Sequence, residues 1–472
     1  MKPSPVSRRH FLHAALAGTA ASQVPAPVLG ADKISPNLFS EPARDIPLSD
    51  DADVIVCGAG PAGVSAAITA ARAGAKVRLF EWRGCLGGVW TAGLLGYFLD
   101  FDKPGFAAEL RTKLDERDAR RGSSARSFAY DPEALKLLLE ELCLEAGVKF
   151  QFHTRVAAAY RDGRRLTTIV TDSKSGRQAW RAPVFIDTTG DGDLGALAGC
   201  AFEIGESADC PCQPMSLNAL LMVKDIERLR EFVRFGKPLP GENTNFEKKV
   251  RIRQEIERTG HFPSYSNPTL WEIRDNLILA MMNHEYGVKP FDAAEVTAAT
   301  TRARAEMNKM VAGLRKLGGP WEGLQLVATA EQIGVRDGRR IAGRFTVQKD
   351  DLVKGARHED GVARVTFGVD IHATSADHNK NAATHATGIK VKPYDIPLRA
   401  LIAKDVDGLM MAGRCISGDF ISHSSYRVTG NAVAMGEAAG VTAALAAASK
   451  RLPHEIAWQE AAEKLKTMGA KS

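Results

Sequence analysis

The sequence has only seven cysteines among 472 residues, and it has no basic cluster interleaved with aromatic side chains. Outside residues 1–31, no stretch approaches the ~18 to 20 apolar residues of a membrane-spanning helix. The scattered cysteines are typical of neither a disulfide framework nor a zinc site, and the charge pattern argues against nucleic-acid binding. Charged residues make up 25% and hydrophobic residues 44%, as in a soluble globular protein of two or three domains. We therefore predict no metal site, no nucleic-acid partner and no stable membrane insertion of the mature chain.

Acidic residues are also missing from the first part of the chain, residues 1–31. Here Arg8 and Arg9 precede Phe11 and the small-residue run Ala14–Ala21, a pattern that resembles a twin-arginine export signal. We therefore predict a cleaved signal peptide, recognition by the twin-arginine export machinery, and a periplasmic or otherwise exported protein. That route carries proteins already folded around a cofactor, which agrees with the cofactor prediction below.

Changes in composition divide the chain into predicted segments. These are the signal peptide at 1–31, a proline-containing linker at 32–50, the first part of a cofactor domain at 51–200, a substrate or cap domain at 201–395, the last part of the cofactor domain at 396–450, and a C-terminal helix or tail at 451–472. Apolar periodicity predicts helices at 61–73, 106–116, 132–146, 225–235, 293–317 and 431–447. Strands are predicted at 53–57, 76–80 and 409–412, with a small antiparallel meander within 148–186.

A glycine-rich turn follows the first predicted strand and opens an alanine-rich helix. Gly58 permits the tight turn, Gly60 lets the backbone approach a pyrophosphate, and Gly63 lets the helix pack on the strand. Glu81 ends the second strand, at the position of a carboxylate that accepts from ribose hydroxyls. Strand, turn, helix and acid together predict a dinucleotide site, which also includes the turn residues Pro61 and Ala62.

Further glycine turns distinguish FAD from a nicotinamide dinucleotide. They fall at or near the ends of predicted strands, and their residues at the cofactor are Gly87, Gly88, Gly190, Asp191, Gly413 and Arg414. Turns of this kind suit a long, extended ligand, so we predict FAD. No second Gly-x-Gly-x-x-Gly follows a strand, which favours an electron acceptor other than NAD(P).

These motifs resemble the bacterial FAD-dependent oxidoreductase family with a glutathione-reductase-type FAD domain. The matching segments are Val54–Glu81, Leu86–Gly93, Ile186–Gly199, Ile333–Gly343, Tyr394–Arg399 and Asp407–Gly440. The resemblance implies an α/β fold, with a Rossmann-like parallel sheet, a small antiparallel meander and an inserted α+β substrate or cap domain. It places Asp419 at the flavin ribitol or the pyrophosphate, and a helix start with Asn431 and Ala432 near the flavin ring. Trp82 and Val156 are assigned to the same cofactor site.

Candidate catalytic residues lie in segments that return to the predicted flavin. His423 is a candidate general base, and Arg427 a candidate for binding a carboxylate or protonating a substrate oxygen. His372, at the end of a predicted strand 369–372, is a second candidate base. Each of these side chains has the alternative of a purely structural role. The same choice applies to three arginines that would hold an anionic substrate or the pyrophosphate, Arg336, Arg339 and Arg340.

The predicted function is oxidation of a small organic substrate at a C–H bond next to oxygen or nitrogen, with hydride passing to flavin N5. One alternative is a reductase on the fumarate-reductase plan, which needs convergent arginines and a histidine from the cap. Residues 201–330 offer His261 and His284 for this, without a recognisable pattern. Another alternative is a flavin-carrying electron-transfer or scaffold subunit without its own substrate site.

Overall fold

The computed structural model describes residues 39, 41–207, 212–381, 384 and 387–469. The predicted signal peptide, residues 1–31, lies outside these residues. Residues 46–472 form one structural unit, and the fold described below belongs to it.

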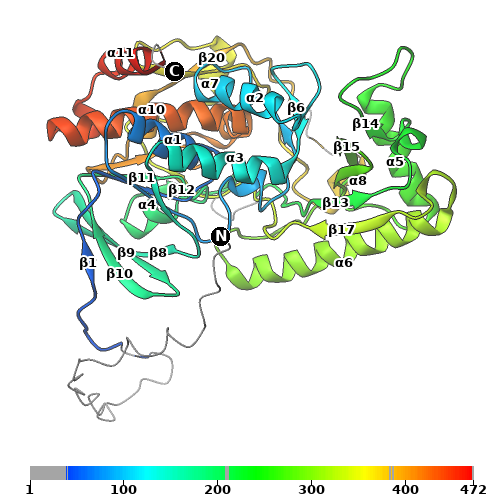
Figure 1. Cartoon of the computed structure of the whole chain (residues 1–472), viewed down its shortest axis with the longest axis horizontal. Coiled ribbons are helices and arrows are strands. Elements are labelled where there is room, and N and C mark those ends of the chain that lie inside the picture. Colours follow the sequence, from blue (N-terminus) through cyan, green and yellow to red (C-terminus); the bar gives the residue numbers. More distant parts are fainter. Residues whose placement is uncertain (1–38, 40, 208–211, 382–383, 385–386, 470–472) are drawn as a thin grey trace, which may run out of the picture. The chain divides into compact units, whose positions relative to one another are not determined.

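A five-stranded sheet, parallel throughout, carries the first predicted motif. Its strand order is β21 (Leu409–Met411), β11 (Val184–Asp187), β2 (Val54–Cys57), β3 (Val77–Phe80) and β7 (Lys149–Gln151). The three middle strands are almost wholly buried, because layers cover both faces of the sheet. Figure 1 shows α1 (Pro61–Arg72), α3 (Pro132–Glu145) and α10 (Thr429–Ser449) on one side of it. Asp131 caps α3 as its sequence position suggests, by accepting from the backbone N–H groups of Glu133 and Ala134.

Helices α1 and α10 cross with almost no side chain between them. A Cβ added at Gly436 would lie 2.3 Å from the carbonyl oxygen of Ala62, and one added at Gly440 would lie equally close to that of Ala66. Ser65 also donates to the carbonyl of Val433 across the same interface. Small residues therefore let the two backbones touch and fix the position of α10 over the sheet.

Helix α10 corrects the expectation that no stretch outside residues 1–31 is long and apolar enough to span a membrane. This helix of 21 residues has a mean hydropathy of 1.4 in its most apolar window, enough for a membrane span by composition. Of that window, 67% is buried inside the protein, against α1 and the sheet. Its apolar character is explained by this core position.

The predicted meander forms the layer on the other side of the parallel sheet (Figure 1). Strands β8 (Arg155–Asp162), β9 (Arg165–Ser173) and β10 (Gly176–Arg181) pair antiparallel in chain order. The end of the predicted linker adds a fourth strand, β1 (Leu48–Ser49), parallel to β10.

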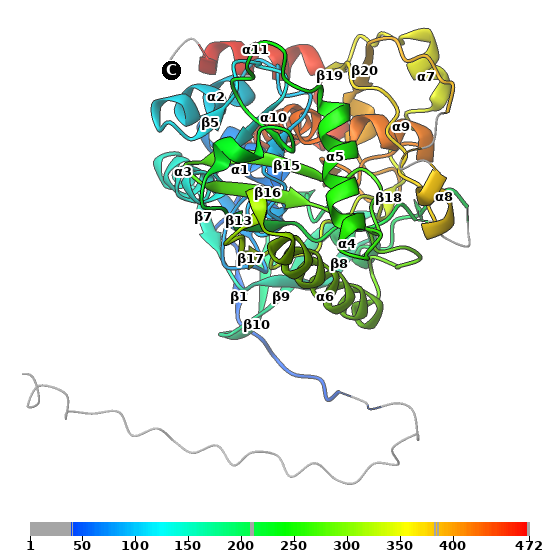
Figure 2. The same ribbon diagram turned by 90° about the vertical axis from the view of Figure 1, so that its right-hand side faces the viewer.

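A second five-stranded sheet lies within the predicted substrate segment. Its order is β14 (Val233–Arg234), β15 (Thr269–Arg274), β16 (Leu277–Met281), β13 (Ala219–Met222) and β17 (Gln325–Thr329), with only β14 and β15 parallel. Figure 2 shows α5 (Asn245–Arg258) and α6 (Ala293–Leu317) over this sheet, and apolar residues of both helices join its core. The helix at 293–317 was predicted with these bounds.

The helix predicted at 225–235 is wrong. The segment holds a short 3₁₀ turn, Ile226–Leu229, followed by strand β14, because Asp225 caps only a single turn. The strand predicted at 369–372 is also wrong: β19 ends at Val365, and His372 makes an isolated bridge to Thr384.

The remaining elements connect these layers. They are β4 (Tyr97–Phe98), α2 (Phe106–Glu116), β5 (Arg120–Arg121), β6 (Phe128–Tyr130), α4 (Asp193–Leu197), β12 (Phe202–Glu203), β18 (Arg340–Ile341), α7 (Lys349–Lys354), β19 (Gly361–Val365), α8 (Ala376–Asn381), β20 (Tyr394–Pro397), α9 (Phe420–Tyr426) and α11 (Trp458–Gly469). The fold class is thus the predicted one, an α/β fold with a Rossmann-like parallel sheet, a meander and an antiparallel substrate-side sheet. The predicted segment boundaries stay predictions.

Candidate active site

The glycine turns gather at the carboxyl edge of the parallel sheet, where α/β folds bind their ligands. Gly58 follows β2, Gly190 follows β11 and Gly413 follows β21, each with a positive φ. A Cβ at Gly58 would lie 2.6 Å from the carbonyl oxygen of Thr188, so no larger residue fits there. Ala62 lies 3.3 Å from the Cβ position of Gly413, which brings the first and last turns together.

The first turn and the Gly87–Gly88 loop touch through backbone atoms. A Cβ at Gly63 would overlap the carbonyl oxygen of Gly58 at 1.9 Å, and one at Gly88 would lie 2.9 Å from Gly60 Cα. The Gly87 N–H also donates to the carbonyl of Ala59. By contrast, the Cβ position of Gly60 has no atom within 4 Å, and Pro61 begins α1 directly after it. A phosphate group fits this open space in front of the helix N-terminus.

Glu81 faces the same turn. It is 4% exposed, and its oxygens accept from the N–H groups of Ala59 at 2.8 Å and Arg83 at 3.0 Å. Each carboxylate oxygen has two acceptor sites, so both keep one for a ribose hydroxyl.

Trp82 lines a cavity of about 260 Å³ at the carboxyl ends of β3 and β7. The other lining residues are His153, Arg155, Asp172 and Ser173. Val156 is the next residue of β8 and is half-buried. The cavity therefore lies next to Glu81 at the carboxyl edge of the sheet.

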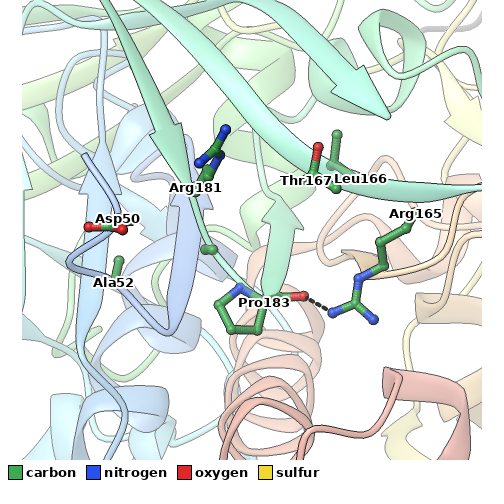
Figure 3. Close-up of a pocket in the computed structure, with 8 residues that line it drawn as sticks. Asp50, Ala52, Arg165, Leu166, Thr167, Arg181 and Pro183 are labelled. Carbon is green, nitrogen blue, oxygen red and sulfur yellow. Dashed lines mark hydrogen bonds between the residues drawn. The ribbon is translucent and has the colours of Figure 1, made fainter. Parts of the chain in front are cut away.

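Another cavity, of about 290 Å³, lies at the opposite edge of the parallel sheet (Figure 3). Its lining includes Ala52, before β2, and Pro183, before β11, and the Pro183 carbonyl accepts from Arg165. Both residues mark the amino edge of the sheet, opposite the glycine turns. It is therefore not part of the cofactor site.

Asp191 and Arg414 link the second and third turns. They form an ion pair of 2.7 Å, and Arg414 lies 2.9 Å from the Cβ position of Gly190. Burial would lower the pKa of Arg414, but Asp191 outweighs this and raises it. The pair crosses the edge of the sheet and holds the two turns at a fixed distance.

The start of α10 points its N–H groups at this edge. Asn431 is fully buried, yet neither its side-chain oxygen nor its nitrogen has a hydrogen-bond partner in the protein. The next residue, Ala432, lies 4.0 Å from the Cβ position of Gly413. A buried amide without a hydrogen-bond partner in the protein is suited to bind a ligand. The positive N-terminal end of α10 favours a negatively charged group there. With the open space at Gly60, these residues fit a bound flavin dinucleotide.

Asp419 caps α9 by accepting from the Ser422 N–H at 2.7 Å, and its other oxygen accepts from the Lys349 N–H at 2.7 Å. Its contact with the flavin ribitol or the pyrophosphate stays a prediction.

His423, one turn into α9, is fully buried, and neither ring nitrogen has a hydrogen-bond partner in the protein. Burial, with the charges of Arg340, Arg427 and Arg414, lowers the pKa of His423 well below its usual value. The ring is therefore neutral at physiological pH and keeps a free lone pair.

Arg427 and His372 meet at one carboxylate. Arg427 donates to the Asp370 carbonyl at 2.8 Å and lies 3.4 Å from its carboxylate, while His372 Nε2 lies 3.3 Å from that carboxylate. Gln213 Oε1 accepts from the backbone N–H of His372 at 3.1 Å and from the guanidinium of Arg427 at 3.2 Å. The structure thus unites two predicted catalytic residues and adds Asp370 and Gln213, which sequence reasoning missed.

A second histidine extends this cluster. His284 Nε2 lies 3.0 Å from His372 Nδ1, and Tyr265 packs on the His284 ring. Because Asp370 only accepts, His372 donates to it through Nε2 and accepts from His284 through Nδ1. That leaves a lone pair on His284 Nδ1, a buried atom without a partner in the protein.

The electrostatics keep both rings neutral. Burial and the charge of Arg336 lower the pKa of His372 to about 4, and they also hold the pKa of His284 well below its usual value. Burial would raise the pKa of Asp370, but His372, Arg427 and Arg336 hold it well below its usual value. A carboxylate, two arginines and two neutral imidazoles thus share one site.

The three arginines of the 333–343 segment have different roles. Arg340 is buried and paired with Asp337, and Arg339 pairs with Asp193 and donates to the Asp191 carbonyl. Both support the turns. Arg336 instead extends into the histidine cluster, where it influences the pKa of both histidines.

A model of the FAD dependent oxidoreductase family matches residues 53–465, almost the whole described chain. The chain belongs to this family. Its cofactor is FAD, and it is an FAD-dependent oxidoreductase.

Individual relatives are distant from this flavoenzyme. Thiamine thiazole synthase of Pyrococcus abyssi is 34% identical over 109 residues, which span 22% of this chain and 41% of that protein. A solved geranylgeranyl bacteriochlorophyll reductase-like protein of Thermoplasma acidophilum is 12% identical, with 90% of this chain and 83% of that one covered and a TM-score of 0.43. The flavin-dependent brominase Bmp2 is 14% identical, with 88% and 83% covered and a TM-score of 0.43.

The cysteines of this flavoenzyme are mostly buried thiols. Cys57, Cys85, Cys143, Cys200 and Cys415 are free and buried. Cys212 forms a disulfide, which the cysteine spacing did not predict. Within the part of the chain that the structure describes, no group of three or more His, Cys, Asp or Glu residues is arranged to hold a metal ion.

Gly88→Ala is expected to impair FAD binding. Its methyl group would meet Gly60 where the two loops touch, and overpacking of this kind costs about 1–3 kcal/mol, or roughly tenfold or more in affinity. The flavin absorbance per protein after purification measures this. Gly163→Ala is the control, because it also has a positive φ but no atom within 4 Å of its Cβ position. Equal flavin content in both variants would contradict the prediction.

Acid should destabilise the protein partly through His372. Because its pKa falls from 6.5 to about 4 on folding, the unfolded chain binds a proton in this window that the folded protein does not. This stability is present above pH 6.5 and lost as the pH falls to about 4, with a contribution on the order of 3 kcal/mol. The free energy of unfolding, measured with denaturant at several pH values in this range, should depend less steeply on pH for His372→Gln than for the wild type. Parallel curves would refute the assignment.

Proposed function

We propose that this flavoenzyme oxidises a small organic molecule at a C–H bond next to oxygen or nitrogen and passes its electrons to an acceptor other than NAD(P). The observation that supports this is the cluster of Arg427, Asp370 and His372, in which Arg427 lies just before the first residue of α10, Thr429. Bound FAD supplies the hydride acceptor. The protein then has to bind the substrate, orient it and remove one proton.

His423 is proposed as the base that takes the substrate proton. It is neutral, and both of its ring nitrogens lack a partner that a substrate O–H or N–H would supply. His372 is less suited, because Asp370 and His284 already occupy its two nitrogens. Arg427 is proposed to hold an oxygen of the substrate, with Asp370 and Gln213 fixing its guanidinium.

Anaerobic bleaching of the flavin tests this proposal. The FAD-loaded protein without residues 1–31 is mixed with hydroxy acids, sugars and amines, and the rate of flavin reduction is followed. His423→Asn is expected to slow reduction by ~100-fold or more, as for loss of a general base, and His454→Asn, on the surface, to leave it unchanged. If no donor bleaches the flavin but a partner protein reduces it, the scaffold-subunit alternative holds and the proposal fails.

A reductase is the second candidate, and one observation favours it. A reductase of the fumarate-reductase type needs convergent arginines and a histidine from the cap. Arg336 and Arg427 lie close to His284 and His372. Reoxidation of the chemically reduced enzyme by α,β-unsaturated acids, without bleaching by any saturated donor, would select the reductase.

We also propose export through the twin-arginine route, on the basis of Arg8 and Arg9. Replacement of both by lysine keeps the charge but removes the guanidinium pair. The expected result is retention of the flavoprotein inside the cell, measured by fractionation and immunoblotting. Unchanged export of the double variant would exclude this route.

A further inference from the structure

Most arginines around the candidate active site are matched to a carboxylate. Their ion pairs are Arg414–Asp191 at 2.7 Å, Arg339–Asp193 at 2.9 Å, Arg340–Asp337 at 3.2 Å and Arg427–Asp370 at 3.4 Å. Pairing of this kind is expected, because an uncompensated charge is costly away from water.

Arg336 has no ion pair among the described residues. Its Nη1 donates to the Pro214 carbonyl at 2.8 Å and to Ser216 Oγ at 2.9 Å, and its Nη2 approaches Met281 Sδ at 3.7 Å. These acceptors are all neutral. A guanidinium has five N–H groups, so these contacts leave the one on Nε and one on Nη2, the side-on pair that matches the two oxygens of a carboxylate.

Arg427 reaches the same place from another element. Its guanidinium is bound to the side chain of Gln213, while that of Arg336 is bound to the carbonyl of the next residue, Pro214. The Nε atom of Arg427 is buried without a partner. The two guanidinium groups are close enough that Arg427, after burial, contributes to lowering the pKa of Arg336 to about 10.

The groups that face these arginines leave the site with a net positive charge. Asp370 supplies one negative charge. His284 and His372 are neutral, and burial raises the pKa of both Tyr265 and Tyr286, so neither phenol is ionised. Arg336 stays protonated at neutral pH. A bound anion would offset this positive charge.

From this arrangement we infer that the substrate is a small carboxylate, whose carboxyl group is bound by Arg336 with support from Arg427. This inference rests on the proposed function for the reaction but not for the binding. It also assigns a role to Ser216 and Pro214, which hold Arg336 in place from its far side.

Direct binding to the FAD-loaded protein tests the inference independently of turnover. Acetate, propionate and benzoate are titrated by calorimetry against their neutral amides, with the visible spectrum of the flavin as a second readout. The wild type is expected to bind at least one carboxylate and not its amide. Arg336→Gln should weaken that binding by ~10- to 100-fold, because it removes a charged hydrogen-bonding pair. Arg251→Gln, which removes an equal charge from the exposed pair between Arg251 of α5 and Glu231, should not weaken it.

The outcomes separate this inference from the proposed function. If neither carboxylates nor amides bind, or if Arg336→Gln and Arg251→Gln weaken binding equally, the inference is overturned. If an uncharged alcohol or amine bleaches the flavin at the same rate in the wild type and in Arg336→Gln, the proposed function stands and the inference falls. If carboxylates bind through Arg336 but no donor bleaches the flavin, the inference stands and the proposed oxidation falls.

Discussion

The start of helix α1 is packed against other backbone with no side chain between them, and the site depends on this contact. The carbonyl of Gly58 fills the place of a side chain at Gly63, Gly88 lies against Gly60, and Gly436 of α10 lies against Ala62. The first glycine turn, the Gly87–Gly88 loop and α10 therefore all contact the N-terminal end of α1. Packing at that density admits little adjustment, so the turns, the loop and α10 have fixed relative positions.

Charge is the second constraint, and it acts on a group of arginines rather than on one. Asp191, Asp193 and Asp337 each neutralise an arginine that fixes backbone at the edge of the sheet. Burial and the charges of Arg340, Arg427 and Arg414 lower the pKa of His423, whereas burial and the charges of Arg336 and Arg427 lower that of His372. Such a site favours neutral bases and negatively charged ligands, because the protein has already placed its positive charges.

The sequence was sufficient where the pattern is local. The strand, turn and helix from β2 to α1, the caps of α3 and the bounds of α6 follow from periodicity and from residues next to them in the chain. The error at 225–235 arose because a polar run with a good cap can end after one turn when its next residues pair in a sheet. The helix α5 was missed, although Thr244 and Glu247 form a capping box, because few of its residues are apolar.

The candidate site was predictable only in part, for a similar reason. His423, Arg427 and His372 were found because their segments return to glycine turns. Gln213 was not found, and His284 was named only for the reductase alternative, because both reach the cluster from loops of the substrate-side region.

 Along the chain, His284 is 88 residues from His372, and Gln213 is 159 residues from it. Contacts over such distances leave no periodic signal in a single sequence.

Arg427 lies between α9 and α10, on the stretch that also carries the helix facing the cofactor, whereas Gln213, His284 and Arg336 come from segments attached to the antiparallel sheet. The two groups of residues therefore belong to different parts of the architecture. Substitutions in the second group can change which molecule is accepted without disturbing the turns that surround the dinucleotide. The two groups of residues meet at Gln213 Oε1, which accepts hydrogen bonds from both His372 and Arg427.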